Sequence, residues 1–158
     1  MPLLAQNKKA SFDYEILEKF EAGLVLFGHE AKALRAGQAS LKGSFIGIKR
    51  KEGKAEVYLL NCQVSPYKNS GPMPEYNQKR ERKLLLKKQE IDYLAGKSQV
   101  EGLTLIPLRI YTSNSFLKLE FALAKGKKKY DKRESIKKKD IERDLRTLTK
   151  RNFKRVDN

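Results

Sequence analysis

Very few side chains in this sequence could carry out covalent or metal chemistry. The 158 residues include one histidine, His29, and one cysteine, Cys62. A nucleophile needs a base within hydrogen-bond reach, and only tertiary coincidence would bring His29 to a serine or to Cys62. One cysteine forms no internal disulfide, and one histidine beside it does not complete a usual zinc site. We expect Cys62 to be a packed apolar residue and His29 a surface or capping residue.

Two further catalytic patterns also fail. Gly126, Lys127 and Lys128 resemble the end of a phosphate-binding loop, but Phe121 stands where its first glycine is needed. Lys128 also replaces the Ser or Thr that holds magnesium in such loops. The carboxylates are scattered among lysines and do not form the cluster that a two-metal nuclease requires. We therefore expect no cofactor, no metal and no enzymatic activity.

Cationic side chains are the chemistry that the sequence supplies in excess. Lys and Arg number 35 against 19 Asp and Glu, a formal net charge of +16, which indicates a polyanionic partner. Residues 1–123 carry 20 basic and 13 acidic side chains, whereas residues 124–158 carry 15 and 6. Most of the apolar periodicity precedes residue 124. We expect a folded body, residues 1–124, and a basic tail, residues 125–158, that is disordered when free.

Length and hydropathy limit the class of protein. A chain of this length is close to one domain, and 39% hydrophobic residues suffice for one modest core. No apolar run approaches the ~18 residues of a membrane span, and the first residues lack the charged front of a signal peptide. We expect a cytoplasmic protein without a membrane partner.

The elements that must position the cations are mostly strands. Alternation at Phe12–Ile16, the apolar run 22–27, and hairpins at 45–49 with 56–64 and 103–111 with 116–124 predict about six short strands. Pro107 indicates an edge or a bulge. With two to three flanking helices, this predicts a mainly β fold, a small closed or partly closed antiparallel barrel. An open sheet with packed helices is the alternative.

Two helices are predicted in the body. Residues 28–37 form a short one that Gly37 ends, and residues 80–94 form the longest one, with Leu84 on its apolar side. Four basic residues would then crowd the positive end of the long helix, where bound phosphate would be favourable: Lys79, Arg80, Arg82 and Lys83. Three consecutive leucines cannot all face one core, which indicates that one of Leu84, Leu85 and Leu86 is exposed or contacts a partner. Periodicity alone favours the alternative, a wide buried face.

The tail carries a thin apolar stripe. Ile141, Leu145 and Leu148 follow one another at spacings of four and three residues on an otherwise charged segment. This stripe is too small to fold alone, so we expect the segment to be disordered until a polyanion neutralises it; a solvated tail without a fixed role is the alternative.

Several blocks resemble one bacterial family over almost the whole chain. They are Asn7–Tyr14, Glu21–Gly23, Lys32–Gly37, Arg82–Leu86 and Ala122–Arg133. The last block is very specific, and the Arg-Lys-Leu-Leu-Leu block is nearly so. In this order they are similar to the SsrA-binding proteins, the small protein B family.

The resemblance implies a fold and a function. The fold would be an oligonucleotide-binding-type barrel with flanking helices. Members bind the tRNA-like domain of transfer-messenger RNA, support its charging with alanine, and accompany it with elongation factor Tu and GTP to stalled ribosomes. The tail is expected to enter the empty mRNA channel, become helical there and contact the decoding centre, so that trans-translation tags the nascent peptide.

The resemblance also implies site residues. The RNA-facing candidates are Asn7, Glu21, Lys32, Arg35 and Leu85, with Lys125, Lys127, Lys128 and Lys129 as phosphate contacts. Asp131, Lys132 and Arg133 match the tail motif linked to the ribosome, and the Tyr130 ring would stack on ribosomal RNA. Among the leucines, Leu85 would be the exposed one.

Some positions depart from the family pattern, and two other classes of function stay open. The departures are His29, Tyr76, Gln78 and Lys87, which affect the loop before residue 80 more than the family resemblance. A structural protein of the ribosome that binds ribosomal RNA would also be small, basic and barrel-like. A nuclease or RNA-modifying enzyme would lose activity, but not RNA affinity, when a carboxylate is removed.

Overall fold

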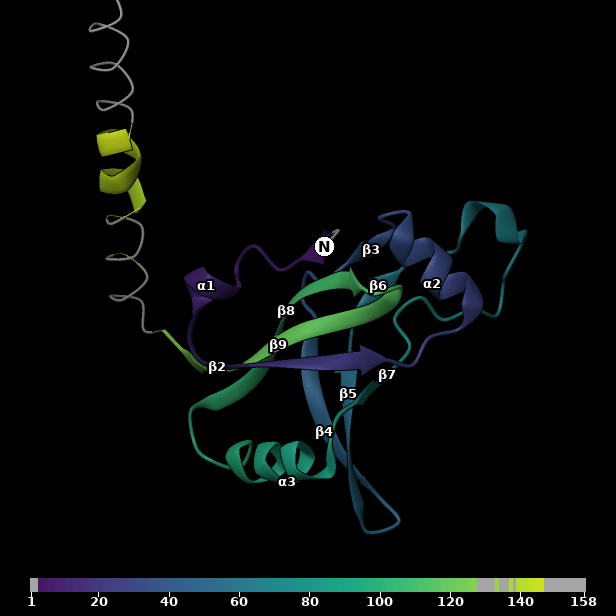
Figure 1. The fold of residues 1–158 in the computed structure, drawn as a ribbon, viewed down its shortest axis with the longest axis horizontal. Helices are drawn as coiled ribbons and strands as arrows, with labels where there is room; N and C mark the ends of the chain where they lie inside the picture. The colour runs from purple at the N-terminus through teal and green to yellow at the C-terminus, as the bar shows by residue number, and fades with distance from the viewer. Residues whose placement is uncertain (1–2, 128–132, 134–136, 138, 147–158) are drawn as a thin grey trace, which may run out of the picture. The chain divides into compact units, whose positions relative to one another are not determined.

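The computed structural model describes residues 3–127, 133, 137 and 139–146. In chain order, its elements are β1 (Leu3–Gln6), α1 (Ala10–Asp13), β2 (Tyr14–Leu24), α2 (Gly28–Arg35), β3 (Ala39–Ser40), β4 (Phe45–Lys51), β5 (Lys54–Leu60), β6 (Gln63–Val64), a 3-10 helix (Lys68–Ser70), β7 (Arg82–Leu85), α3 (Lys88–Lys97), β8 (Leu103–Ser113) and β9 (Phe116–Gly126). Figure 1 shows the long strands β2, β8 and β9 running beside one another.

Seven strands form one antiparallel sheet. Their order is β1-β8-β9-β2-β7-β5-β4, and β3 pairs separately with β6. Among the described residues, β1 and β4 end this order without a hydrogen-bonded ladder between them, so the sheet does not close. The prediction of a mainly β antiparallel fold with flanking helices is confirmed. Because the sheet does not close, it matches the predicted alternative, an open sheet with packed helices.

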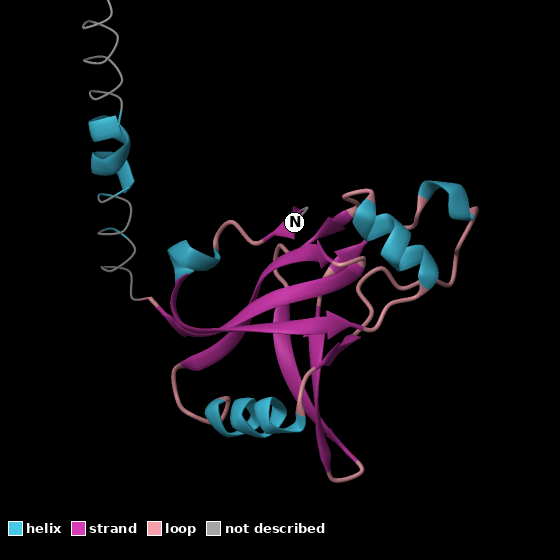
Figure 2. Cartoon of the chain, in the orientation of Figure 1, coloured by secondary structure: helices cyan, strands magenta, loops and turns pink. Residues whose placement is uncertain are grey.

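The core lies on one side of the central strands. Ala22 of β2, Leu84 of β7 and Leu119 of β9 are at most 2% exposed and belong to one apolar cluster. Leu34 of α2 and Leu94 of α3 join the same cluster. Figure 2 shows these two helices on opposite sides of the strands. A second, smaller cluster that includes Ala10 of α1 and Ala122 of β9 covers part of the other face, and the rest of that face carries polar side chains.

The hairpins form where turn residues tolerate a positive φ. Glu52 and Gly53 (φ 52° and 76°) join β4 to β5, and Asn114 and Ser115 (φ 49° and 69°) join β8 to β9. The bulge predicted at Pro107 is confirmed, because the β8–β9 register shifts between Pro107 and Arg109. Helix α2 covers most of the predicted 28–37 segment.

The predicted helix over residues 80–94 is wrong. Residues 82–85 form strand β7, and α3 begins only at Lys88. Burial in β7 alternates residue by residue, which is the period of a strand that pairs on both edges. Strand β7 pairs with β2 and β5, so tertiary pairing overrides the helical tendency of this leucine-rich segment. Leu84 and Leu94 both reach the core, but from different elements.

The chain divides into two units, residues 1–126 and residues 127–158. Strand β9 extends to Gly126, so Lys125 is part of the sheet. In the second unit, residues 139–146 are helical and exposed. In the part of the chain that the structure describes, no helix has both the length and the apolar character needed to cross a membrane.

Candidate nucleic-acid interface

The face of the central strands that points away from the core carries the candidate interface, and we call it the outer face. Cross-strand partners share a face of a sheet, and successive residues alternate between faces. Gly23 of β2 lies between Leu85 of β7 and Lys118 of β9. Two residues along, Glu21 lies opposite Glu120. The outer face therefore presents carboxylates, cations and an exposed leucine on adjacent strands.

Three of the predicted site residues, Glu21, Lys83 and Leu85, meet on the outer face. Leu85 is 56% exposed while Leu84 is 1% exposed, so the expectation that Leu85 is the exposed leucine is confirmed. A shallow depression of about 390 Å³ is lined by Glu21, Gly23, Leu85, Leu86, Lys87, Glu90 and Lys118, with Ala22 below. A Cβ at Gly23 would lie 3.5 Å from the Leu85 side chain, an ordinary van der Waals distance, so a larger side chain there would begin to fill the depression.

Glu21 is charged and oriented at neutral pH. The Lys118 ammonium donates a hydrogen bond to Glu21 Oε1 at 2.6 Å. This bond, and a second one from Tyr111, lower the pKa of the Glu21 carboxyl from its ordinary value. Burial and the bond to Glu21 raise the pKa of Tyr111 to about 12. Glu21 is therefore an acceptor-only group, suited to amino groups of bases or to ribose hydroxyls.

Three further cations of the outer face are also paired. Lys83 Nζ lies 3.3 Å from Glu56 Oε1, and both Arg109 and Lys19 contact Glu120. Hydrogen bonding by the Tyr58 hydroxyl, above all, lowers the pKa of Glu56. Such exposed pairs contribute about 0–1 kcal/mol to stability, so a phosphate can replace the carboxylate partner at little cost.

Helix α2 brings Arg35 to the β8–β9 turn, at one end of the outer face. Arg35 Nη2 donates to the Ser115 carbonyl of the β8–β9 turn at 2.9 Å. Lys32 lies one helical turn earlier, and its ammonium is 6.0 Å from the centre of the Tyr67 ring. Both side chains are exposed.

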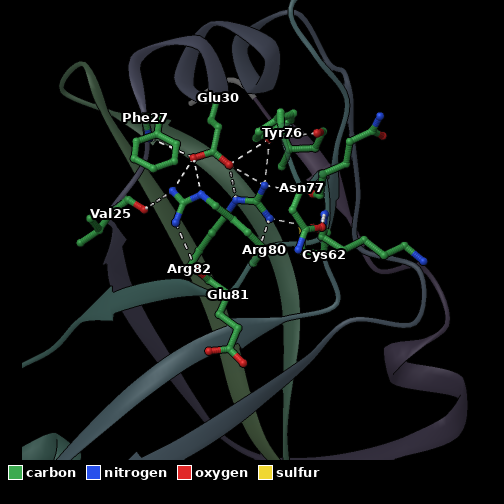
Figure 3. A network of polar contacts seen from close by, with 12 residues as sticks. Val25, Phe27, Glu30, Cys62, Tyr76, Asn77, Arg80, Glu81 and Arg82 are labelled. Atoms are coloured by element: carbon green, nitrogen blue, oxygen red, sulfur yellow. Dashed lines mark hydrogen bonds and ion pairs between the residues drawn. The ribbon is translucent and has the colours of Figure 1, made fainter. Parts of the chain in front are cut away.

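A buried charge network holds α2 against β7. Glu30 of α2 is fully buried, and its Oε2 accepts hydrogen bonds from Arg82 Nε at 2.8 Å and Arg82 Nη2 at 2.5 Å. Its Oε1 accepts from Arg80 Nε and from the Phe27 N–H, each at 3.0 Å, and the Tyr76 hydroxyl donates to Oε2. Figure 3 shows both guanidinium groups converging on this carboxylate. Glu30 therefore joins the helix that carries Arg35 to the strand that carries Leu85.

The electrostatics of Glu30 show that the network is strong. Burial alone would raise the pKa of this carboxyl, but hydrogen bonds from Arg80, the Phe27 N–H and Arg82 outweigh it and lower the pKa to about 2. A carboxylate of this kind stays ionised throughout the physiological pH range.

Arg82 does not belong to the interface as the sequence predicted. It is 1% exposed, and its Nη1 donates to the Cys62 carbonyl at 2.7 Å. The misassigned helix is the cause, since strand alternation turns Arg82 inward and Lys83 outward. Arg80 is partly exposed, but its guanidinium is bound to Glu30 and lies 4.1 Å from the centre of the Phe27 ring. Both arginines position other residues.

Asn7 and Lys125 lie apart from this end of the sheet. The Asn7 amide donates to the Pro107 carbonyl at 3.0 Å, and Lys125 of β9 pairs with Leu103 and Glu15. A larger depression of about 710 Å³ contains Asn7 together with Lys8, Lys9 and Lys42. The candidates of the body thus form two groups rather than one.

Part of the predicted tail site lies outside the described residues, namely Lys128, Lys129, Tyr130, Asp131 and Lys132. Lys127 is half-buried and Arg133 is exposed. Ile141 and Leu145 are 59% and 58% exposed on the helix of residues 139–146.

The groups that could have done covalent chemistry are packed. Cys62 is 0% exposed, and burial raises the pKa of its thiol to about 11, so it is not a reactive thiolate. The His29 ring packs edge-on against Tyr76, with ring centres 4.7 Å apart. Within the described residues, no group of three or more His, Cys, Asp or Glu could hold a metal ion.

Sequence reasoning missed three residues of this region: Glu30, Lys118 and Gly23. Glu30 had no visible signal beyond its place in the first turn of a helix. Lys118 and Gly23 become informative only when the register of β2 and β9 is known.

A mainly β protein whose exposed sheet face mixes cations, hydrogen-bond acceptors and apolar side chains is typical of RNA-binding proteins. A family model described as SmpB protein matches residues 4–151. The SsrA-binding protein of Syntrophobacter fumaroxidans is 52% identical over 94% of this chain and 89% of its own length. That of Thermosipho africanus is 50% identical over 96% and 99%. The chain therefore belongs to the SmpB family of SsrA-binding proteins.

A solved structure is also similar to this one. It is described as "tmRNA-SmpB: a journey to the center of the bacterial ribosome" and is 41% identical to this chain. The TM-score is 0.62, and the match covers 83% of this chain and 92% of the other. The similarity of fold thus extends over nearly all of that protein.

Proposed function

We propose that the protein binds the tRNA-like domain of transfer-messenger RNA and accompanies it to stalled ribosomes for trans-translation. The observation that carries this proposal is the 52% identity to an SsrA-binding protein over 94% of the chain. The similar solved structure, a tmRNA–SmpB structure of the bacterial ribosome, supports the same partners. Elongation factor Tu with GTP joins through the alanylated RNA.

The RNA contacts are proposed on two groups of residues. The first consists of Glu21, Lys83 and Leu85 on the outer face, together with Lys32 and Arg35 of α2, of which Arg35 contacts the β8–β9 turn. The second contains Asn7 and Lys125, with Lys127, Lys128 and Lys129 following along the chain. Phosphate contacts fix the register of the RNA, and Glu21 supplies a hydrogen-bond acceptor for selectivity. Arg80 and Arg82 support the first group from within the protein.

The tail is proposed to be the part that senses the empty mRNA channel. Residues Tyr130 to Arg133 would contact the decoding centre, and Ile141 and Leu145 would lie on the helix that enters the channel. The helical conformation of residues 139–146, with Ile141 59% exposed, supports this role.

The protein acts as an RNA-binding factor in the cytoplasm, and we propose that it is not an enzyme. The packing of Cys62 supports this, as does the ring contact of His29. Charging of the RNA and peptide transfer belong to its partners.

The proposal is tested by recovering the tagged protein from bacterial cells and sequencing the RNA that it retains. One dominant small RNA with a tRNA-like end is expected. Ribosomal RNA that stays bound through subunit washing would indicate a structural ribosomal protein instead.

The division of labour is tested with a chain that ends after Asp131. It should bind the tRNA-like domain, with some loss of nonspecific, charge-driven affinity, and fail to support tagging on stalled ribosomes. The matched variant, Ile141→Pro in the full chain, should impair tagging more than Ile141→Ala, because proline costs about 3 kcal/mol in a helix interior. Tagging by the truncated chain at the parental rate would contradict the role of the tail.

A further inference from the structure

Phe116 is exposed in a way that the fold does not require. At 71%, it is the most exposed large apolar side chain in the described part of the chain. It is the first residue of β9, directly after the β8–β9 turn. A single exposed ring is common on protein surfaces, so its role is argued from the side chains beside it.

The turn that presents Phe116 is held in place. Asn114 and Ser115 both adopt a positive φ, as a tight two-residue hairpin turn requires. The guanidinium of Arg35 bonds to the Ser115 carbonyl from helix α2 at 2.9 Å. The Glu30 network then fixes α2 to β7. The ring is therefore presented on a supported hairpin tip rather than on a free loop.

The neighbours of Phe116 on the outer face are apolar and cationic. Lys118 is two residues further along β9 on the same face, opposite Gly23. Val25, which is 43% exposed, donates its N–H to the Lys83 carbonyl at 3.0 Å. Leu85 is opposite Gly23 on the other side. Lys118 and Leu85 line the depression at Gly23, while Phe116 is two residues from Lys118 along β9, next to the depression rather than in its lining.

This combination fits a single-stranded segment of RNA. Sheet proteins that bind RNA stack unpaired bases on exposed aromatic rings, while cations beside the ring hold the phosphates. Two residues along a strand span about 6.6 Å, so adjacent nucleotides of one strand reach both Phe116 and the depression at Gly23. The ion pairs of Lys83 and Lys118 are exposed enough to be exchanged for phosphate.

We propose that Phe116 is a base-stacking residue, on which an unpaired base of the bound RNA lies while the next nucleotide occupies the depression over Gly23. This inference rests on the proposed function, since it assigns a contact within the same complex. The ring supplies affinity that is independent of base identity. Glu21, at the far side of the depression, supplies the acceptor that selects among bases.

The first experiment measures binding of the transcribed tRNA-like domain by Phe116→Ala, Phe116→Leu and Phe116→Tyr. We expect affinity to fall on the order of tenfold for Ala and Leu, and to stay near the parental value for Tyr, because only Tyr keeps the ring. The salt dependence should not change, since no phosphate contact is lost. Parental affinity of the Ala and Leu variants, or equal losses with Tyr, would overturn the inference.

The sequence contains no tryptophan, so a second experiment can follow the fluorescence of one introduced indole. Phe116→Trp places a single indole at the tip, and Val100→Trp places one at a 49% exposed position beyond α3 as the matched control. Adding the tRNA-like domain should quench the first indole by base stacking and leave the second unchanged. Equal quenching of the Phe116→Trp and Val100→Trp variants would overturn the stacking contact.

The two proposals fail in different ways. If the parental protein does not prefer the tRNA-like domain over an unrelated RNA of equal length, the proposed function fails. If the parent binds but the Phe116 variants bind equally well, only the stacking inference fails. A defect in tagging with parental RNA affinity would assign Phe116 to the ribosome and would also overturn it.

Discussion

The two faces of strand β7 place the same kinds of residue in opposite roles. Arg82 and Leu84 point inward and are each 1% exposed, whereas Lys83 and Leu85 point outward at 44% and 56%. The first pair joins the buried network and the apolar core, while the second pair borders the candidate interface. Stability and recognition are therefore separated by a shift of a single residue along the strand.

The ion pairs on these faces also differ in strength. Glu30 is buried between two guanidinium groups, so removing one partner leaves a buried charge without compensation. The ion pair of Glu56 and Lys83 is partly exposed, at 22% and 44% of the two side chains. The buried ion pairs of Glu30 fix the geometry of the fold, whereas the exposed ion pair of Lys83 can be exchanged for a ligand.

The largest expected effect is the difference in stability between a substitution at Leu84 and the same substitution at Leu85. Leu84→Asp should destabilise the body by several kcal/mol, or prevent folding, because it buries an unpaired carboxylate. Leu85→Asp should unfold near the parental midpoint in urea but abolish binding of the tRNA-like domain. Urea titration and RNA titration of both variants are the measurements. Unfolding of the body by Leu85→Asp would show that this side chain is structural after all.

The next effect compares the two cations of β7. Arg82→Ala should cost about 3–5 kcal/mol in unfolding free energy, because it leaves Glu30 and the Cys62 carbonyl without a main donor. Lys83→Ala, the matched control, should cost less than about 1 kcal/mol. The predicted helix would instead have placed both cations at its positive end, where their removal leaves stability unchanged or slightly higher. Similar unfolding midpoints for the two variants would contradict the assignment of faces.

The misread strand shows what sequence reasoning could and could not reach. The hairpins, the short helix α2 and the bulge at Pro107 followed from alternation and turn residues, which are local signals. Strand β7 has only four residues, and its pairing with β2 and β5 is a long-range property. Leu85 was still chosen correctly as the exposed leucine, through the family resemblance. The burial of Arg82 was not predicted, because its partner Glu30 is 52 residues away in the chain.

A third effect is the acid sensitivity of the buried network. The Glu30 pKa of about 2 lies below its ordinary value of 4.5, so the carboxylate stabilises the folded state fully above pH 4.5. That contribution, about 3 kcal/mol, is lost as the pH falls from 4.5 towards 2. Glu30→Gln should be less stable at neutral pH and show a shallower loss across this window. Chemical denaturation from pH 6 to pH 2 measures both slopes.

Glu21→Gln is the control for the acid experiment. The Glu21 pKa is also lowered, chiefly by the Lys118 hydrogen bond, but this carboxyl is exposed and contributes little to folding. Its variant should therefore keep the parental slope. If Glu30→Gln and the parent lose stability in parallel between pH 4.5 and pH 2, the network is not what acid disrupts.

The smallest expected effect lies in the salt dependence of RNA binding by the outer cations. Lys83→Ala should reduce the slope of log affinity against log salt by about 0.9 unit or less, because one phosphate contact and its released counterion are lost. Lys54→Ala, at an exposed position in the β4–β5 hairpin away from the depression, should keep the parental slope. Because Lys83 is paired with Glu56, part of its gain from phosphate is offset by breaking that pair, so the change in affinity at any one salt concentration is small. The slope still reports the lost contact, because it depends on the number of counterions released and not on the binding free energy. If Lys83→Ala and Lys54→Ala both reproduce the parental slope, the outward face of β7 contacts RNA through Leu85 alone.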